Sequence, residues 1–590
     1  MGTALCERCA QLVEDLSAYV RRLSREIVEK IKECIQAIAQ CCCMRRKGKG
    51  TIPRTSYKPL VQEHERLAAQ ELVQHLGSGS ESVLLGNDCL QALNTLAVSE
   101  NNELQQSAAV YLLHLSEHLP TALPSEFLEP YPALLRSCDV EVQRTTSLSL
   151  VNLLVDHNEL IVEMGTMEPI LDLLESGDLT VQCNSCACVA MLATSDANRE
   201  AIMSGDGVLR ILVLAKSYDP RIQRNAVGAL LNLTRSERVV GALCQEGVLP
   251  VLALLLQSAD VEVQTSVNFQ FYSCSALRNV AAVQEHHSSM LGIGDRFLLK
   301  SLLSLLSSPV EKNSCQACLC LRNLSENVQT QEELMALGCV PPLTTMLRSP
   351  AVGKSESAIT LLSALSQHPP NRDGLVEEGL VQAVDELLLL HSSRTTVLSL
   401  GAVTVANLST TPTGQQAVMD SHCVSRLLTA LDPTSATEGA RICIASCLHH
   451  LTCLELLKPH IAEKMTAEHI SHLVRYASQE EIPELSFHAA CIIGELGMNV
   501  APLLRPRCDA VLGYLLQFLK SPEVRFQQLA IATLSTLKND ECFAAAVSGS
   551  TVQEQLCRVR AQTEKTSKLL SMVSPTSPST DQPPSAQSLD

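Results

Sequence analysis

Aromatic residues are scarce in this sequence, and tryptophan does not occur. The 590 residues include eight Tyr, eight Phe and no Trp, and the net charge is −18. Proteins that bind nucleic acid usually present a basic surface, often with aromatic side chains that stack on bases. The composition therefore argues against nucleic acid as a partner and suits helices packed through Leu, Ala and Val.

Motifs for catalysis and cofactor binding are also missing. There is no GxSxG, HExxH, P-loop or Gly-rich dinucleotide fingerprint, and the histidine pairs 286–287 and 449–450 are isolated in the sequence. We therefore predict a protein that is not an enzyme and that needs no cofactor.

The 25 cysteines follow neither a disulfide nor a metal pattern. Many lie in apolar helical patterns such as CNSCACVAML, where Cys acts as a small buried hydrophobe, as is usual in a reducing cytosol. Two CxxCxC groups occur, but each lies in one predicted helix without a second CxxC nearby, so a four-ligand zinc site is not expected. We predict that both groups are core: Cys183, Cys186 and Cys188, and Cys315, Cys318 and Cys320.

No cleavable signal peptide is recognisable, and no apolar run approaches the ~20 residues that span a bilayer. The body is therefore expected to be soluble.

Charge is spread unevenly: residues 1–58 hold 12 Lys/Arg and 6 Asp/Glu, a balance of +6, which leaves −24 for the remainder. This asymmetry predicts a basic N-terminal arm on an acidic body.

A unit of roughly 42 residues repeats along most of the chain. Good copies end in a predicted helix that carries an asparagine, as in ALLNLT and CLRNLS. Weaker copies carry other residues in this slot, and successive slots from 152 lie 39 to 47 residues apart. The asparagine slots are Asn152, Asn232, Asn279, Asn323 and Asn407, and the weaker slots are Met191, Ala364, His450, Glu495 and Thr536.

This period predicts an all-α armadillo-repeat solenoid, a right-handed stack of about 10–11 three-helix repeats over residues 61–545. A glycine opens the second helix of each strong repeat, where it permits a sharp bend, and a turn with Asp or Pro precedes the third helix. One step is too long: Asn232 and Asn279 lie 47 residues apart, and TSVNFQ (265–270) is the apparent excess. It either lengthens a turn or reflects an exon choice or an error in the gene model.

The repeated asparagines are the candidate binding residues. An amide side chain offers a donor and an acceptor, so a regular row can hold the backbone of an extended peptide. Alternatively, each Asn bonds to the neighbouring repeat and holds the superhelix. Arg278 and Arg322 directly precede two of them, and Arg144 and Arg224 lie near the start of their third helices, so they either line a basic groove or are solvated surface residues.

The N-terminal arm, residues 1–60, carries candidate lipidation sites. Gly2 permits myristoylation, although position six holds Cys rather than Ser or Thr. A cysteine triplet is followed by four basic residues within 45–49, which resembles a palmitoylation site with electrostatic support. The alternative is a cysteine-rich helix end beside a solvated linker. The candidate acylated residues are Gly2, Cys6, Cys9, Cys41, Cys42 and Cys43.

An amphipathic helix is predicted over 10–40, which either lies on the membrane, caps the first repeat or competes for the groove. The Ser/Pro-rich end of the chain, within 546–590, is predicted to be disordered after a last helix end. Ser574 and Ser577 precede prolines there and are candidate phosphorylation sites.

The segments IVEMGTMEPILDLLESGDLTVQCNS, YDPRIQRNAVGALLNLTRSE and SCQACLCLRNLSEN resemble the vacuolar protein 8 family. The resemblance is best over about 145–345. It implies a non-enzymatic adaptor, anchored by myristoyl and palmitoyl groups to the cytoplasmic face of the vacuole or lysosome, with some cytosolic pool. It also implies that Gly2 serves as an anchor, and that Arg278, Asn279, Arg322 and Asn323 line a groove for extended segments of partner proteins. A soluble adaptor of junction or ciliary type is the alternative, and homo-oligomerisation stays open.

Overall fold

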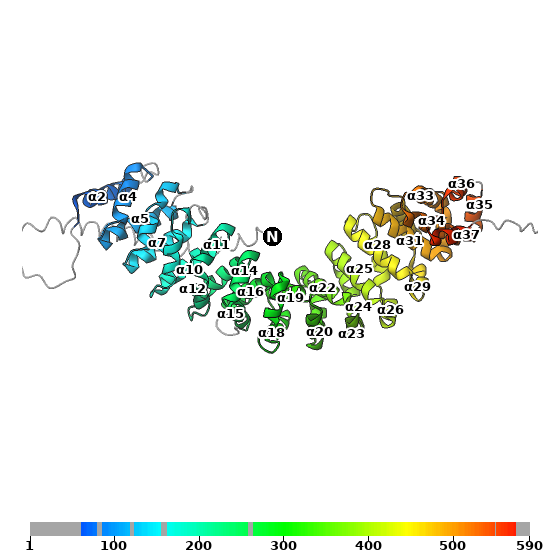
Figure 1. The fold of residues 1–590 in the computed structure, drawn as a ribbon, viewed down its shortest axis with the longest axis horizontal. Helices are drawn as coiled ribbons and strands as arrows, with labels where there is room; N and C mark the ends of the chain where they lie inside the picture. The colour runs from blue at the N-terminus through cyan, green and yellow to red at the C-terminus, as the bar shows by residue number, and fades with distance from the viewer. Residues whose placement is uncertain are drawn as a thin grey trace, which may run out of the picture. The chain divides into compact units, whose positions relative to one another are not determined.

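The computed structural model describes residues 61–78, 85–118, 123–154, 162–257, 263–548 and 550–573, and all regular structure in these ranges is helical (Figure 1). The chain divides into two compact units, residues 1–302 and 303–590. The predicted all-α class is therefore confirmed, whereas the division into two units was not anticipated. Each unit is described separately.

Unit 1 is a stack of short repeats in which the third helix of one repeat packs on the third helix of the next. These third helices are α5 (Asn102–His118), α7 (Val140–Leu153), α10 (Leu179–Leu192), α13 (Pro220–Leu233) and α16 (Val263–Ala281). The helices that complete the repeats are α2 (Glu63–Ser78), α4 (Asn87–Ala97), α6 (Tyr131–Leu135), α9 (Met167–Leu173), α11 (Asp196–Ser204), α12 (Gly207–Leu214), α14 (Glu237–Gln245), α15 (Val248–Leu255) and α17 (His287–Leu291). Helix α18 (Phe297–Leu306) crosses the division between the units.

Unit 2 follows the same plan. Its third helices are α19 (Glu311–Leu324), α22 (Val352–Gln367), α25 (Thr395–Leu408), α28 (Glu438–Thr452), α31 (Pro483–Leu496) and α34 (Val524–Leu537), each packed on the next. The remaining helices are α20 (Val328–Ala336), α21 (Val340–Leu347), α23 (Arg372–Glu377), α24 (Leu380–Leu390), α26 (Pro412–Met419), α27 (Cys423–Ala430), α29 (Leu457–Lys464), α30 (Ala467–Ala477), α32 (Ala501–Leu504), α33 (Cys508–Lys520), α35 (Glu541–Val547), α36 (Thr551–Arg558) and α37 (Glu564–Val573).

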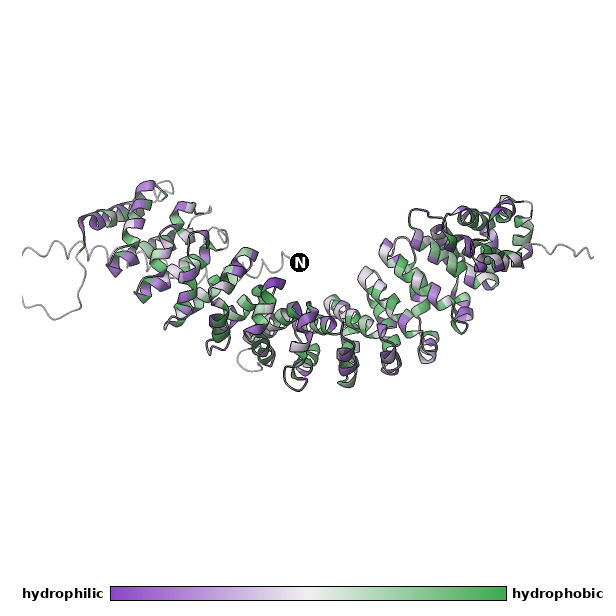
Figure 2. Ribbon diagram, viewed as in Figure 1, coloured by the Kyte–Doolittle hydropathy of each residue, from purple (hydrophilic) through white to green (hydrophobic). Residues whose placement is uncertain are grey.

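Hydrophobic and hydrophilic residues share most of these helices, as Figure 2 shows. The side chains turned between helices are mainly Leu, Ala, Val and Cys, and many are completely buried. Cys186, Cys188, Cys318 and Cys320 are among the fully buried residues. Burial raises the pKa of the Cys186, Cys188 and Cys318 thiols, which keeps them protonated.

The longest apolar stretch among the described residues, Pro483–Lys520, has the length and hydropathy of a membrane span. It is folded as α31, α32 and α33, and 56% of its most apolar window is buried inside unit 2. The stretch therefore serves as core, although the expectation that no such run exists was too strict.

The predicted glycine bend between first and second helices is present. Gly247 and Gly379 have φ of +83° and +78°, a region that glycine adopts without strain. Gly207 differs, because the positive φ of 56° falls on Asp206 before it. A Cβ at Gly207 would lie 2.7 Å from the carbonyl oxygen of Ile202, so close packing requires this glycine.

The extra residues between Asn232 and Asn279 lie in a helix. Helix α16 has 19 residues, whereas α7, α10, α13 and α19 have 14 each. Segment 265–270 forms the N-terminal part of α16, so the insertion lengthens the third helix.

Packed helices continue beyond residue 545. Helix α37 packs on α34, where the Gln528 side chain donates to the hydroxyls of Thr563 and Thr566, 3.0 Å from each. The Lys538 ammonium donates to the Met572 carbonyl near the end of α37. Helix α37 thus occupies the position of a further third helix and covers α34.

The C-terminus of a third helix is repeatedly capped by a side chain six residues later, in the first helix of the next repeat. Arg199, only 4% exposed, donates to the Ala193 and Thr194 carbonyls at 2.7 and 2.8 Å. In unit 2, Gln331 donates to the Ser325 carbonyl and Arg372 to the Ser366 carbonyl, at 2.6 and 2.9 Å. The last carbonyls of a helix have no partner within it, so these side chains satisfy them.

Several third helices begin with an aspartate cap. Asp178 Oδ1 accepts from the Thr180 and Val181 amides, 3.0 Å from each, and the Asp178 carboxylate is also bound by the Arg144 guanidinium. The bond from Arg144 is the main cause that lowers the pKa of Asp178 to about 2. Asp139 and Asp219 cap α7 and α13 in the same way.

We predict that Asp178→Ala destabilises α10 by about 1–2 kcal/mol, because a helix cap and a partly exposed ion pair are lost. Asp178→Asn tests the charge. The pKa of Asp178 is about 2 in the folded protein and near 3.9 in the unfolded chain. The charge on Asp178 therefore stabilises the folded state fully above pH ~4, and this contribution disappears as the pH falls through 2. Hydrogen exchange of the α10 amides at pH 7 and pH 3 measures both effects. The control is Asp206→Asn, because Asp206 is exposed and its side chain makes no cap hydrogen bond.

Candidate functional site

The third helices carry every repeat asparagine, and four of the five bind the preceding repeat through the amide nitrogen. Asn152 Nδ2 donates to Ser116 Oγ at 3.2 Å, and Asn279 Nδ2 to Thr234 Oγ1 at 3.2 Å. Asn407 Nδ2 donates to Ser366 Oγ at 3.0 Å. Asn232 Nδ2 reaches the Ala190 carbonyl directly, at 2.7 Å. We call this series the asparagine ladder; it is the second of the two roles that the sequence allowed.

The hydroxyl partners of the ladder have a sequence signal of their own. Thr234 lies two residues after the slot of its repeat, and Ser366 two residues after the weak slot at Ala364. Asn232 and Thr234 therefore belong to two successive rungs: Asn232 donates to the preceding repeat, and Thr234 accepts from the following repeat. Where Ala193 replaces the hydroxyl, Asn232 bonds to a backbone carbonyl instead.

The amide oxygens of the ladder are used less. Among the described residues, no donor bonds to Oδ1 of Asn152, Asn232 or Asn407. Asn152 and Asn407 are partly exposed, so each keeps an acceptor that a peptide amide could use. Holding the stack and binding a peptide are thus compatible at these two positions.

The two Arg-Asn pairs form a different local arrangement. Arg278 donates from Nη2 to the Asn279 oxygen at 3.3 Å, and Arg322 from Nη1 to the Asn323 oxygen at 3.2 Å. Arg322 also forms an ion pair with Glu326 at 3.2 Å, while 42% of its side chain stays exposed. One Arg-Asn pair lies in each unit.

The other two arginines named from the sequence differ from each other. Arg144 is bound to Asp178 and Glu141, and its hydrogen bond to Asp178 is the first cause that raises the pKa of the guanidinium. Arg144 is therefore a structural ion-pair residue. The Nε of Arg224 is buried and has no hydrogen-bond partner among the described residues.

In unit 2 a pair of histidines joins the third helices α28 and α31. Nδ1 of His449 on α28 lies 3.1 Å from Nδ1 of His488 on α31. Burial lowers the pKa of both rings, and the charge on His488 would further lower that of His449. One ring must donate while the other accepts, so this contact requires at least one neutral imidazole. The buried Nε2 of the slot residue His450 has no hydrogen-bond partner among the described residues.

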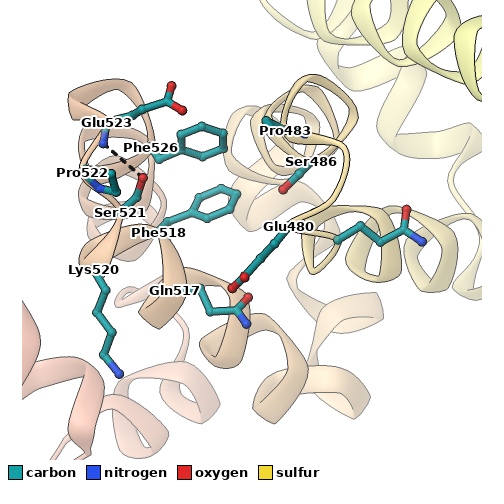
Figure 3. Close-up of a pocket in the computed structure, with 11 residues that line it drawn as sticks. Glu480, Pro483, Ser486, Gln517, Phe518, Lys520, Ser521, Pro522, Glu523 and Phe526 are labelled. Atoms are coloured by element: carbon teal, nitrogen blue, oxygen red, sulfur yellow. Dashed lines mark hydrogen bonds between the residues drawn. The ribbon is translucent and has the colours of Figure 1, made fainter.

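A cleft of about 370 Å³ opens in unit 2 between the turn before α31 and the turn before α34. Figure 3 shows Phe518 and Phe526 side by side, facing Pro483 and Ser486 across the cleft. The two rings pack edge to face, with their centroids 4.7 Å apart. The rim carries Glu480, Glu523 and Lys520, so its charge is mixed. The cleft offers an apolar contact surface and no converging pair of catalytic groups.

One group of metal-ligand residues lies close together in the described chain: Asp432, Glu468 and His472, with ligand atoms within 4.8 Å of one another. Asp432 Oδ1 already accepts from the Thr434 amide and hydroxyl, and Glu468 is exposed. Proximity alone does not assign a cation here.

The predicted anchor residues Gly2, Cys6, Cys9, Cys41, Cys42 and Cys43 lie outside the described residues.

No family model matches this chain. Vacuolar protein 8 of Schizosaccharomyces pombe is 28% identical over 506 residues, which cover 84% of this chain and 88% of that protein. Vacuolar protein 8 of Komagataella pastoris is 41% identical, and that of Candida albicans 39%, over segments that cover 21% of this chain and about a fifth of each relative.

Two solved structures share the architecture. A chain from a study of the phosphorylation switch that controls the interaction between cadherin and β-catenin has a TM-score of 0.62 and 14% identity, covering 82% of this chain and 98% of that one. An engineered protein has a TM-score of 0.60 and 22% identity, covering 69% and 98%. These similarities show the fold alone, and they confirm the predicted armadillo-repeat class.

We predict that Asn279 and Thr234 are energetically coupled by about 1 kcal/mol, because each variant removes the same inter-repeat hydrogen bond. Asn279→Ala, Thr234→Val and the double variant are compared by hydrogen exchange of the α13 and α16 amides. Thr194→Val is the control, since Thr194 makes a similar bond to the carbonyl three residues before it. Additive effects of Asn279→Ala and Thr234→Val would contradict the ladder.

Proposed function

Because the chain is a homologue of vacuolar protein 8 with an armadillo-repeat fold, we propose that this non-enzymatic scaffold tethers extended segments of partner proteins to a membrane. Its third-helix face holds the segments, and its N-terminal arm, residues 1–60, carries the anchor. The relatives' name supports the vacuole or lysosome as the membrane. The scaffold would meet its partner proteins on the cytoplasmic face of that membrane.

The Arg-Asn pairs are the observation that carries the peptide-binding part. At each pair the arginine bonds to the amide oxygen of its neighbour, which fixes a cation beside the ladder. A guanidinium held this way can bind a carboxylate with two parallel hydrogen bonds. The preferred segments are therefore extended and acidic. Asn152 and Asn407 add amide oxygens that accept from a peptide backbone.

The arm offers three attractions to a membrane. A myristoyl chain on Gly2 alone would bind a membrane only marginally, whereas acylation within Cys41–Cys43 and the adjacent basic residues would add a second and a third attraction. Cys6 and Cys9 are further acylation candidates. A cytosolic armadillo adaptor without an anchor is the second candidate, since the fold alone serves either function.

We expect wild-type protein to pellet with lysosomal or vacuolar membranes and to incorporate labelled acyl chains. Gly2→Ala, and separately the triple change Cys41→Ser, Cys42→Ser and Cys43→Ser, should lose label and shift the protein to the supernatant. Cys138→Ser, at an exposed cysteine of unit 1, is the control and should pellet normally. A wild-type chain that stays unlabelled and soluble would establish the unanchored adaptor instead.

The peptide face is tested by charge reversal. Peptides selected on the wild-type chain should bind Arg278→Glu or Arg322→Glu at least about tenfold more weakly, because an attraction becomes a repulsion. Arg238→Glu is the matched control: Arg238 lies on the first helix α14 and is 86% exposed. Titration of labelled peptides gives the Kd values. Equal losses for all three variants, or none, would reject the third-helix face as the binding surface.

A further inference from the structure

The cleft between the turn before α31 and the turn before α34 lies against a row of four aromatic rings (Figure 3). Such a row is notable in a chain with eight Tyr and eight Phe in all. The Phe526 centroid lies 4.7 Å from that of Phe518 and 5.5 Å from that of Phe487, and Tyr514 lies 5.5 Å beyond Phe518. Phe518 and Phe526, which line the cleft, are each 6% exposed, so the core holds most of each ring in place. The cleft therefore offers a preformed aromatic surface.

Unused hydrogen-bond donors lie beside these rings. Gln479 and Gln517 line the cleft, and in the described part of the chain neither side-chain amide makes a hydrogen bond. The Ser486 hydroxyl, in contrast, already donates to the Ala477 carbonyl at 2.7 Å. Each free amide carries two N–H donors. The site thus suits an apolar ligand whose carbonyl groups need partners.

A proline-rich segment in the polyproline II conformation has these properties. Proline has no N–H, and the polyproline helix has no internal hydrogen bonds, so its carbonyls stay available to donors. Grooves lined by aromatic rings bind such segments, and binding orders them at little entropic cost because the proline ring fixes φ. The C-terminal tail, residues 574–590, has four prolines in 17 residues, including the pair Pro583 and Pro584.

The tail begins within reach of the cleft. Helix α37 lies along α34 in the same direction, because its N-terminal part bonds to Gln528 and its last turn to Lys538. The tail therefore starts near the C-terminal end of α34, whereas the cleft lies at the N-terminal end of this 14-residue helix, ~21 Å away along its axis. Residues 574–582 span up to ~30 Å when extended. This length also covers the ~10 Å needed to cross the width of α34.

We propose that the cleft binds the Pro583–Pro584 segment of the chain's own tail in the polyproline II conformation. Tethering gives the tail an effective concentration on the order of 1 mM at the cleft. The tail can therefore fill a shallow site that a free segment of another protein, at lower concentration, would leave mostly empty. The site lies at the turns between helices and is independent of the peptide face and of the anchor.

The experiment uses photo-crosslinking in the full chain. Glu480 is an exposed rim residue, so Glu480→p-benzoylphenylalanine places the crosslinker at the cleft. After irradiation and trypsin digestion we expect peptide 476–507 linked to tail peptide 569–590. The control is Asn499→p-benzoylphenylalanine, because exposed Asn499 lies in the same tryptic peptide. It belongs to the turn η4 (Gly497–Val500), which packs on α34 near Thr536. Random collisions of the tail would favour Asn499, since it lies nearer to the start of the tail.

Two paired changes test which prolines bind. Pro583→Ala combined with Pro584→Ala should lower the yield of linked peptide about tenfold, because the rings that fill the cleft are lost. Pro575→Ala combined with Pro578→Ala is the control and should leave the yield unchanged. Both pairs follow α37 in the sequence, so neither change touches a packed helix.

An equal mixture of isotope-labelled and unlabelled chains identifies the source of the bound tail. Links only between peptides of the same label would support the proposal. Links between labelled and unlabelled peptides would assign the cleft to the tail of a second copy and overturn it. The proposal also fails if position 480 gives no link, if position 499 gives as much, or if the loss of Pro583 and Pro584 leaves the yield unchanged.

Discussion

The hydrogen bond from a third-helix asparagine to the preceding repeat fixes the register of three pairs of neighbouring repeats in unit 1 and of the repeats that contain α22 and α25 in unit 2. A single repeat cannot bury the apolar side of its third helix, so the helix is stable only against its neighbours. Apolar packing alone leaves the register between adjacent third helices loosely defined. A directional bond, such as Asn407 to Ser366, fixes one atom of each helix against the next. The surface positions of nearby side chains then follow.

The same bond explains how a structural residue can take part in recognition. An amide has two ends, and the ladder uses the nitrogen of Asn152, Asn232 and Asn407. In the Arg-Asn pairs the oxygen is occupied as well, by the preceding arginine. The face therefore contains positions that offer an acceptor and positions that offer a cation. Which of the two a repeat presents depends on the single residue before its asparagine.

Much of the fold could be predicted from the sequence, because period, helix patterning and turn residues are local signals. The glycine bend at Gly247 and the aspartate turn before α10 are examples. Contacts between residues that lie a whole repeat apart were harder to predict. A hydroxyl two residues after the slot, as at Thr234 and Ser366, is a recurring sequence signal that could have identified the acceptors of the ladder. His449 and His488 lie 39 residues apart in degenerate copies, where no repeat pattern links them. The division near residue 302 and the packing of α37 have no comparable local signature.

The caps at the ends of the third helices show that a structural repeat does not end where its last helix ends. Arg199, Gln331 and Arg372 each belong to the repeat that follows the helix they cap. A shortened chain that stops at the last residue of α10, α19 or α22 would leave that helix with exposed, unpaired carbonyls. The smallest self-contained segment is therefore permuted relative to the sequence repeat: it extends through the first helix of the next copy. Gene duplications that preserve this overlap would add repeats without creating an uncapped junction.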